Sequence, residues 1–303
     1  MCIPMLKMMK KLFLMISVVL TFSYPTAAQK SAVVDIPMTF NGTRPVVEVM
    51  VNGKGPFLFL IDTGAQGQAR ADVSLVQRLG LPSTGQSAST DDTGKNAVNL
   101  NAVRMDTLSI GNISFREVTA LSRNYNSSSY LPDIDGILGF NLFSDYLLTL
   151  DYPNKRVRIE RGELPKADGA QILNFEKREG DTFGDPLIEI SVGSLKAKAL
   201  IDTGNIFGIT LPTALVKKLS LASYKTAVGK AKTVSNEFEI SEVRLQDTIS
   251  IGRHLFPEPT IIFADVFDDV IIGSTDLKEF AVTFDQKNHR VRFVKKQKIR
   301  AKK

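Results

Sequence analysis

The sequence predicts an all-β protein made of two similar lobes, and three observations favour this fold class. The same unit is present twice, because residues 60–64 (Leu-Ile-Asp-Thr-Gly) return 140 positions later as residues 200–204. Short apolar segments interrupted by single polar residues, which are typical of half-buried strands, recur through both units. A helical spacing of apolar residues is confined to one short segment in each unit.

The duplication is supported by matches on both sides of the pentapeptide. Residues 106–111 return as residues 247–252 at an offset of 141. Near the end of each unit, seven identical residues recur at an offset of 134: Gly139, Thr149, Asp151, Asn154, Arg156, Val157 and Arg158 match Gly273, Thr283, Asp285, Asn288, Arg290, Val291 and Arg292. A single short match can arise by chance, but a series in the same order indicates one unit that was duplicated and fused.

Each copy of the pentapeptide is predicted to end a strand. Residues 46–51 and 187–192 carry apolar side chains around a single glutamate, as half-buried strands do. Each leads through a glycine-containing turn into a second strand, at 57–61 or 196–201. The run Leu-Phe-Leu-Ile at 58–61 has no polar interruption, which suits a strand buried on both faces. A strand that ends in Asp-Thr-Gly places the carboxylate at the point where the chain turns.

One short helix is predicted in each unit. Asp72 can cap a helix over residues 73–79, and Gly80 is a stop signal. In the second unit Pro212 stands near the helix start, and residues 215–219 repeat the apolar face.

The remaining segments divide the chain into parts. Polar stretches at residues 83–96 and 224–237 follow the helices and are typical of hairpins or loops. Residues 161–170, with two glycines and a proline, form the natural linker between the units. We therefore expect a leader at 1–28, an N-terminal lobe at 29–165, a C-terminal lobe at 166–294 and a basic tail at 295–303.

The first 28 residues predict a secretory signal peptide. Three lysines precede an apolar run over residues 12–22, and small residues stand at positions −3 and −1 of a cleavage site after Ala28. The run is shorter than the about 20 apolar residues that cross a bilayer comfortably. We expect an exported chain, periplasmic or extracellular, that begins at Gln29 and has no transmembrane span. The rival interpretation is an uncleaved membrane anchor.

Several kinds of site are excluded by composition. The only cysteine, Cys2, lies in the leader, so the mature chain has no disulfide, thiol nucleophile or cysteine-ligated metal. His254 and His289 are the only histidines, and neither lies near a second ligand motif. We expect both to be surface residues and predict no metal site or histidine-dependent triad. No phosphate loop or dinucleotide fingerprint is present, so no cofactor is implied. Four aspartates are interpreted as acidic turn residues rather than as a cation site: Asp133, Asp135, Asp268 and Asp269.

The net charge of +6 says little about partners. The leader holds three lysines without an acid, and residues 295–303 hold six cations without an anion. Once these nine cations are removed, residues 29–294 carry a net charge of −3. A terminal basic run is typical of a solvated chain end, and the alternative is contact with an anionic lipid surface. Nothing else in the sequence favours nucleic-acid binding.

The repeated motifs resemble those of the aspartic peptidases. Each Asp-Thr-Gly follows an apolar strand and is followed by an apolar-apolar-Gly triplet, at residues 137–139 and 271–273. Residues 135–140 (Asp-Gly-Ile-Leu-Gly-Phe) and 151–156 (Asp-Tyr-Pro-Asn-Lys-Arg) are similar to stretches of the bacterial retropepsin-like aspartyl proteases. The resemblance covers both units. It implies two small retropepsin-like β-barrels in a pepsin-like arrangement, with a central cleft between them.

The resemblance also implies that Asp62 and Asp202 are the catalytic pair. Two carboxylates about 3 Å apart cannot both be ionised, so they share one proton. The ionised partner can take a proton from water while the protonated partner donates to the carbonyl oxygen of the substrate. Because such a pair titrates as a unit, neither aspartate is assigned as the acid or the base.

Neighbouring residues are expected to support the pair. Gly64 and Gly204 let the backbone turn tightly enough for an N–H group to reach a carboxylate oxygen. The resemblance implies that Thr63 and Thr203 form hydrogen bonds across the interface between the lobes. The loops depart from the family pattern at three positions, which predicts unequal surroundings for the two aspartates: Gln66, Asn205 and Ile206.

Two functions from different classes remain open. The first is an exported aspartic endopeptidase that acts as a monomer on an extended peptide, with residues 83–96 and 224–237 as flaps over the cleft. The second is a catalytically inactive peptide-binding protein that retains the fold. Intact Asp-Thr-Gly in both units favours the first function, whereas Asn205 and Ile206 favour the second.

Overall fold

The structure of the protein is a computed structural model that describes residues 33–90, 97–126, 131–176, 185–233, 237–266 and 268–296. The predicted leader at 1–28 and the part of the basic tail beyond Lys296 lie outside the described residues. Among the described residues, the longest helix has seven residues, and none combines the length and apolarity needed to cross a membrane.

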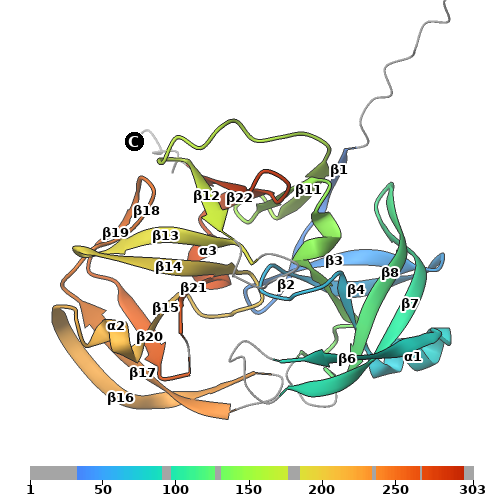
Figure 1. The fold of residues 1–303 in the computed structure, drawn as a ribbon, viewed down its shortest axis with the longest axis horizontal. Helices are drawn as coiled ribbons and strands as arrows, with labels where there is room; N and C mark the ends of the chain where they lie inside the picture. The colour runs from blue at the N-terminus through green and yellow to red at the C-terminus, as the bar shows by residue number, and fades with distance from the viewer. Residues whose placement is uncertain are drawn as a thin grey trace, which may run out of the picture. The chain divides into compact units, whose positions relative to one another are not determined.

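The N-terminal lobe is built on an eight-stranded sheet. Its elements are β2 (Thr39–Asn41), β3 (Arg44–Val51), β4 (Lys54–Asp62), β5 (Ala69–Asp72), α1 (Val73–Leu79), β6 (Ser83–Ser89), β7 (Val98–Ile110), β8 (Ile113–Arg123), β9 (Gly136–Gly139) and the 3-10 helix η1 (Phe140–Phe143). The strand order is β2-β3-β4-β9-β5-β8-β7-β6, and β3 also pairs with β7 (Figure 1). That additional pairing closes the sheet into a barrel.

The C-terminal lobe repeats this topology. Its elements are β13 (Leu187–Val192), β14 (Leu195–Asp202), β15 (Ile209–Pro212), α2 (Thr213–Val216), β16 (Leu221–Lys232), β17 (Glu237–Leu245), β18 (Ile249–Ile251), β19 (His254–Phe256), β20 (Thr260–Ala264), β21 (Val270–Gly273) and α3 (Ser274–Leu277). The order β13-β14-β21-β15-β20-β17-β16 follows that of the first lobe. Ser109 pairs with Met50, and Ser250 pairs with Ser191, which are the positions 141 residues later. The register therefore confirms the duplication that the sequence predicts.

Six strands from the start, the middle and the end of the chain form a sheet that joins the lobes. They are β1 (Val34–Pro37), β10 (Leu147–Asp151), β11 (Arg156–Glu160), β12 (Ile172–Glu176), β22 (Phe280–Asp285) and β23 (Arg290–Lys295), in the order β1-β11-β10-β22-β23-β12. At its centre β10 runs antiparallel to its repeat equivalent, β22. Thr149 lies opposite Thr283, and their hydroxyl oxygens are 2.9 Å apart.

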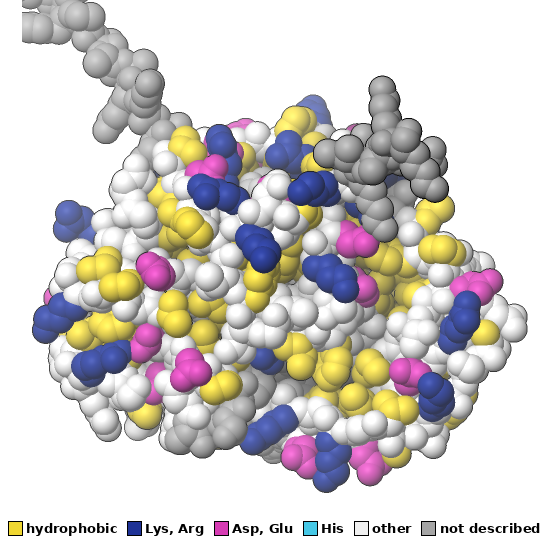
Figure 2. Space-filling view, turned by 180° about the vertical axis from the view of Figure 1, so that it is seen from behind, with side chains coloured by type: hydrophobic (Ala, Val, Ile, Leu, Met, Phe, Trp, Pro, Cys, Tyr) yellow, Lys and Arg dark blue, Asp and Glu magenta, His cyan; other side chains and the backbone are white. Residues whose placement is uncertain are grey.

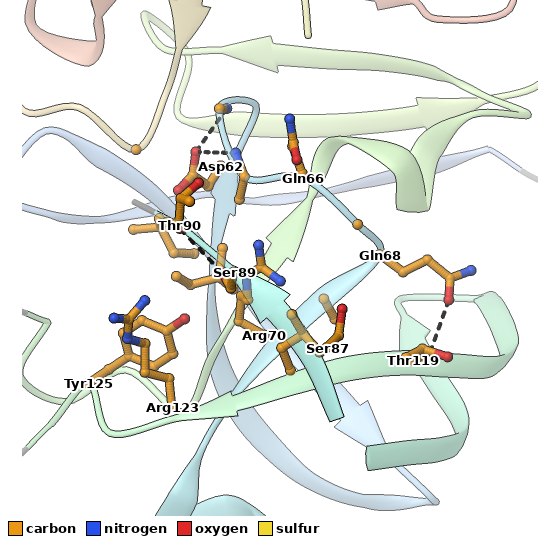
Figure 3. A pocket seen from close by; sticks show the side chains of 18 of the residues that line it. Asp62, Gln66, Gln68, Arg70, Ser87, Ser89, Thr90, Thr119, Arg123 and Tyr125 are labelled. Carbon is orange, nitrogen blue, oxygen red and sulfur yellow. Dashed lines mark hydrogen bonds between the residues drawn. The ribbon is translucent and has the colours of Figure 1, made fainter. Parts of the chain in front are cut away.

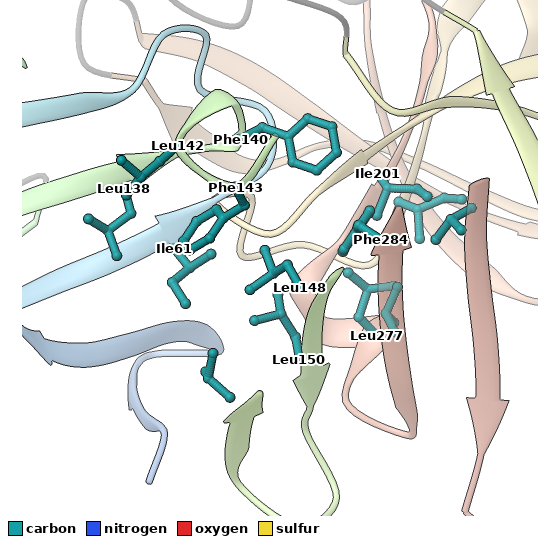
Figure 4. Packing of buried hydrophobic residues seen from close by; sticks show 14 of the residues in the cluster. Ile61, Leu138, Phe140, Leu142, Phe143, Leu148, Leu150, Ile201, Leu277 and Phe284 are labelled. Atoms are coloured by element: carbon teal, nitrogen blue, oxygen red, sulfur yellow. The ribbon is translucent and has the colours of Figure 1, made fainter. Parts of the chain in front are cut away.

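The main hydrophobic core runs through both lobes. Figure 4 shows Ile61 and Leu138 of the first lobe, Leu148 of the joining sheet and Ile201 of the second lobe in the same cluster. Phe140 and Phe284 meet edge to face, with ring centroids 5.4 Å apart. Because the strands that end in the two aspartates are anchored in this one core, the core fixes the place where they meet.

The predicted helices are present, with the expected end signals. Asp72 is the N-cap of α1 and accepts a hydrogen bond from the N–H of Ser74, and Gly80 ends the helix with φ +62°. Pro212 is the N-cap of α2, which is a single turn. The apolar-apolar-Gly triplets are followed by two further short turns, η1 and α3.

Both polar segments that follow the helices belong to hairpins, as predicted. Residues 83–96 contain β6, which pairs with β7, and residues 224–237 contain most of β16 and the start of β17. Residues 91–96 and 234–236 of these two segments lie outside the described residues.

The expectation that His254 is a surface residue is wrong. His254 lies on β19 and is 9% exposed, with its ring edge against Phe280 at a centroid distance of 4.9 Å. Its Nε2 is 3.3 Å from the carbonyl oxygen of Phe293. Burial lowers the pKa of this imidazole. The β18–β19 hairpin packs against the joining sheet, a contact that a lone histidine in the sequence does not reveal.

Candidate active site

The two predicted aspartates end equivalent strands, one in each lobe. Asp62 ends β4, which runs parallel to β9, and Asp202 ends β14, which runs parallel to β21. Each aspartate is paired in register with the glycine of an apolar-apolar-Gly triplet, Gly139 or Gly273. A Cβ on Gly139 would lie 2.9 Å from the carbonyl oxygen of Ala65. Glycine at the end of the apolar-apolar-Gly triplet therefore leaves room for the loop that follows the Asp-Thr-Gly triplet.

The side chains of Asp62 and Asp202 meet between the lobes and share a hydrogen bond. Each lies directly against the glycine that follows the opposite aspartate. A Cβ on Gly64 would lie 2.7 Å from Cγ of Asp202, and a Cβ on Gly204 would overlap the carboxylate of Asp62. These glycines are therefore required by the close approach of the two carboxylates.

Backbone N–H groups hold both carboxylates in the same way. Oδ1 of Asp62 accepts hydrogen bonds from the N–H groups of Gly64 at 2.9 Å and Ala65 at 3.1 Å. Oδ1 of Asp202 accepts from the two equivalent N–H groups at 2.8 and 3.1 Å. Hydrogen bonds to a charged carboxylate favour its ionised form, and they fix its orientation toward the other aspartate.

Thr63 and Thr203 form hydrogen bonds across the interface, as the resemblance implies. The hydroxyl of Thr63 donates to the carbonyl oxygen of Ile201 at 2.6 Å, and that of Thr203 donates to the carbonyl oxygen of Ile61 at 2.7 Å. Both threonines are buried, at 1% and 0% exposure. The bonds tie the end of each central strand to the opposite lobe.

The pair is electrostatically uneven. Asp202 is 2% exposed, whereas Asp62 is only partly buried. Burial raises the pKa of Asp62, and this effect is opposed by hydrogen bonds from Gly64 and with Asp202 and by the positive charge of Arg44. A raised carboxyl pKa beside a second carboxylate is the arrangement expected of two acids that share one proton.

Arg44 is a residue of this site that the sequence did not single out. It is 8% exposed, and its Nε donates to the carbonyl oxygen of Gly204 at 2.6 Å. Thr43 adds a hydroxyl contact of 2.6 Å to Ser274. The position 141 residues after Arg44 is Asp185, which is also buried. Equivalent positions of the two lobes thus carry opposite charges.

Both lobes of the chain match a known protein family. Residues 47–142 and 188–275 each match a family described as aspartyl protease. These two segments cover more than half of the chain, and each contains one Asp-Thr-Gly triplet. The chain belongs to the aspartyl protease family. No match was found among curated proteins. Tandem matches to this retropepsin-like family agree with the two barrels of the structure.

The departures from the aspartyl protease pattern leave the inner hydrogen bonds intact. Gln66 is exposed at the edge of the site, and Ile206 is 40% exposed. The side-chain oxygen of Asn205 accepts a hydrogen bond from the N–H of Phe207 at 2.8 Å, so it shapes its own loop. The two aspartates differ in exposure, and the positive charge of Arg44 lowers the pKa of Asp62.

A cavity of about 650 Å³ opens beside Asp62. Its walls come from the ends of β4, β5, β6 and β8, with Leu200 and Gly204 from the second lobe. Figure 3 shows Ser89 and Thr90, at the end of the β6 hairpin arm, facing this cavity. The hairpin predicted as a flap therefore forms one wall of a pocket that reaches Asp62.

Besides Arg44, sequence reasoning missed four charged or phenolic side chains of the pocket: Arg70, Arg123, Tyr125 and Asp185. A weak signal existed, because Arg70 stands between two alanines in a strand that is otherwise buried. Arg123 ends β8, Tyr125 follows it, and Asp185 lies just before β13. Only the fold brings these three residues next to Asp62.

Proposed function

We propose that this chain is an exported aspartic endopeptidase that cleaves a peptide bond with Asp62 and Asp202 as its catalytic pair. The observation that carries the proposal is the contact between the two carboxylates, each fixed by two N–H groups at the end of a buried strand. Membership of the aspartyl protease family supports the reaction class.

The geometry suits general acid–base hydrolysis by a bound water. The aspartate that is ionised takes a proton from the water, whose oxygen attacks the carbonyl carbon of the substrate. The aspartate that is protonated donates to the carbonyl oxygen, and a proton then passes to the leaving nitrogen as the C–N bond breaks. The backbone N–H bonds on Asp62 and Asp202 keep both carboxylates aimed at the same point. This positioning avoids a costly rearrangement during the reaction.

The substrate is an extended peptide or protein segment bound between the two hairpins. β6–β7 and β16–β17 supply strand edges to which an extended backbone can add hydrogen bonds. Figure 2 shows cationic and anionic side chains interspersed over one face of the molecule. Several described cations form ion pairs, such as Lys225 with Glu242 and Lys230 with Glu237. A mixed surface of this kind does not create the one-signed field that attracts nucleic acid.

The catalytic assignment is tested with two matched substitutions. Asp62→Asn and Asp202→Asn should each lower turnover of a peptide library by about 10²–10⁴-fold or more, because general acid–base catalysis is lost. Asp106→Asn on β7 is the control, since Asp106 is exposed and its side chain is paired with Arg104 instead of with the site.

Pepstatin should inhibit the wild-type protein. Either active-site variant with near wild-type turnover would exclude this pair. Peptide binding without cleavage by the wild-type protein would favour the inactive binding protein.

Export is tested separately. The lysine-rich start, the apolar run at 12–22 and the small residues before position 29 motivate the expectation that the mature chain begins at Gln29. N-terminal sequencing of protein from the medium or periplasm should return Gln29 first. Recovery of the protein from membranes with residues 12–22 still attached would support the anchor interpretation.

A further inference from the structure

The pocket beside Asp62 carries more positive charge than a pocket for an apolar side chain needs. Three arginines line it, Arg44, Arg70 and Arg123, against two acids, Asp62 and Asp185. The remaining wall combines neutral polar side chains, such as Gln66, Gln68 and Thr119, with apolar ones, such as Leu121, Leu131 and Ile137. Binding pockets usually carry only a few polar groups among hydrophobic side chains, so three arginines are more than orientation of a ligand requires. A cluster of arginines next to a carboxylate pair therefore calls for a physical reason.

Arg70 is the first part of that reason. It lies on β5, paired in register with Ile137 and Leu121, and its side chain is partly buried. Within the described residues, its guanidinium forms no hydrogen bond or ion pair. Burial of a charged group is unfavourable unless an opposite charge or an acceptor compensates for the lost water. A partner from outside the chain would supply that compensation.

Arg123 and Tyr125 form the second part. Arg123 is the last residue of β8, and Figure 3 shows it beside the ring of Tyr125 on the wall of the cavity. Burial raises the pKa of Tyr125 to about 12, against the opposing charges of Arg70 and Arg123. Both guanidinium groups therefore lie near the same phenol. Tyr125 thus marks the place where the two positive charges converge.

Asp72 fixes the backbone that carries Tyr125. It lies in register with Arg123 at the end of β8, and both of its side-chain oxygens accept hydrogen bonds. Oδ1 accepts from the N–H and hydroxyl of Ser74 at 2.9 and 2.6 Å. Oδ2 accepts from the N–H groups of Tyr125 and Asn126 at 2.8 and 3.1 Å. These bonds fix the backbone that carries Tyr125 next to the two arginines.

We propose that Arg70 and Arg123 form a subsite that binds a carboxylate of the substrate peptide close to the scissile bond. The carboxylate is that of an aspartate or glutamate side chain or that of a free C-terminus. Guanidinium groups bind carboxylates through paired N–H···O bonds, which give both affinity and orientation. The arginines also offset the repulsion between this carboxylate and the ionised aspartate of the catalytic pair. The inference rests on the proposed peptidase function and names its substrate class.

The test compares matched peptides and matched arginine variants. The best-cleaved library peptide is resynthesised with glutamate or glutamine at each position around the scissile bond, with an amidated or a free C-terminus. The wild-type protein should show kcat/KM about 10–100-fold higher for a glutamate peptide at one position, or for the free-acid peptide, as expected for a partly buried charge-assisted bond. Arg70→Gln and Arg123→Gln should remove this preference, measured within each variant as the ratio of kcat/KM for the glutamate and glutamine peptides.

Arg116→Gln is the matched control, because Arg116 lies exposed on the same strand as Arg123 and outside the pocket. It should keep the full preference for the acidic peptide. Thermal unfolding of each variant, compared with that of the wild-type protein, shows that the variant is folded. Arg70→Glu should in addition shift the preference toward a lysine peptide. Loss of the preference on amidation alone identifies the C-terminal carboxylate as the ligand and supports the subsite.

Binding by the Asp62→Asn variant separates this inference from the peptidase proposal. Titration calorimetry with the glutamate and glutamine peptides should show the same preference without cleavage. Equal kcat/KM and equal binding for every glutamate–glutamine and acid–amide pair would overturn the subsite while peptidase activity stands. If the wild-type protein cleaves no library peptide, the peptidase proposal fails. In that case acidic and neutral library peptides are compared by binding alone, and equal affinities overturn the subsite.

Discussion

Thr63 and Thr203 exchange hydrogen bonds across the boundary between the lobes. The N–H of Thr63 donates to the hydroxyl oxygen of Thr203 at 3.0 Å, and the N–H of Thr203 donates to the hydroxyl oxygen of Thr63 at 3.1 Å. Each hydroxyl also donates to a carbonyl oxygen of the opposite lobe. Four buried hydrogen bonds therefore depend on the hydroxyl groups of two residues that directly follow Asp62 and Asp202 in the chain.

Replacing one of these hydroxyls should be costly for stability. Thr63→Val keeps the shape of the side chain but leaves the N–H of Thr203 and the carbonyl oxygen of Ile201 without partners in a buried place. We expect a loss of about 2–4 kcal/mol in the free energy of unfolding, because each buried unsatisfied group costs about 1–3 kcal/mol. Thr63→Ser keeps the hydroxyl and should lose less. Denaturant titration of both variants measures the difference, and equal stabilities would contradict the role given to the hydroxyl.

Asp62→Asn should stabilise the protein near neutral pH while it abolishes activity. Burial raises the pKa of Asp62 in the folded state above its ordinary value of 3.8. At a pH above the pKa of the unfolded chain and below the raised pKa of the folded state, the folded protein holds a proton that the unfolded chain has released. The contribution of Asp62 to the free energy of unfolding therefore falls as pH rises through this window. Asparagine keeps the size and one acceptor oxygen without the charge, so we expect a gain on the order of 1 kcal/mol at neutral pH.

Denaturant titrations across pH provide the measurement. The difference between Asp62→Asn and wild type should grow as pH rises above the ordinary pKa of the carboxyl group. Asp106→Asn is again the control and should change stability little, because Asp106 is exposed. A variant less stable than wild type at neutral pH would show that the charge of Asp62 stabilises the fold.

Arg44 should set the pH range of activity. Its positive charge lowers the pKa of Asp62. Arg44→Gln should therefore shift both limbs of the kcat/KM–pH profile to higher pH, by about one unit for an opposite charge at close range. Arg44→Lys retains a positive charge and should shift the profile less, which separates the charge effect from loss of the hydrogen bond to Gly204. Identical shifts for both variants would assign Arg44 a packing role.

One chain should contain a complete active site. Both aspartates lie on one polypeptide, and the chain needs no association entropy to bring its halves together. Specific activity should therefore stay constant on dilution. A mixture of Asp62→Asn and Asp202→Asn proteins should remain inactive, because neither chain can complete the other. Recovery of activity in the mixture, or loss on dilution, would instead show that a lobe pairs with its counterpart in a second chain.

The sequence predicted the parts of this fold that depend on local or repeated signals. Asp72 and Gly80 delimit α1 because capping is a property of neighbouring residues. The meeting of Asp62 and Asp202 could be predicted because the duplication provides one Asp-Thr-Gly triplet in each lobe. Arg44 and Tyr125 were missed because their importance comes from contacts made across long stretches of chain. Arg44 acts on Gly204, 160 residues away, and no local pattern records such a contact.

The pairing of β10 with β22 determines which strand edge each half of the chain would expose on its own. Thr149 and Thr283 are repeat equivalents and face each other in register, so the seam joins a strand to its own counterpart. A threonine hydroxyl can donate or accept, and the seam is therefore self-complementary. Either half expressed alone would expose a strand edge with unpaired N–H and C=O groups, for which a second copy of the same edge is a ready partner. Fusion of the halves fills this edge within one molecule, so that neither half needs a second copy to complete it.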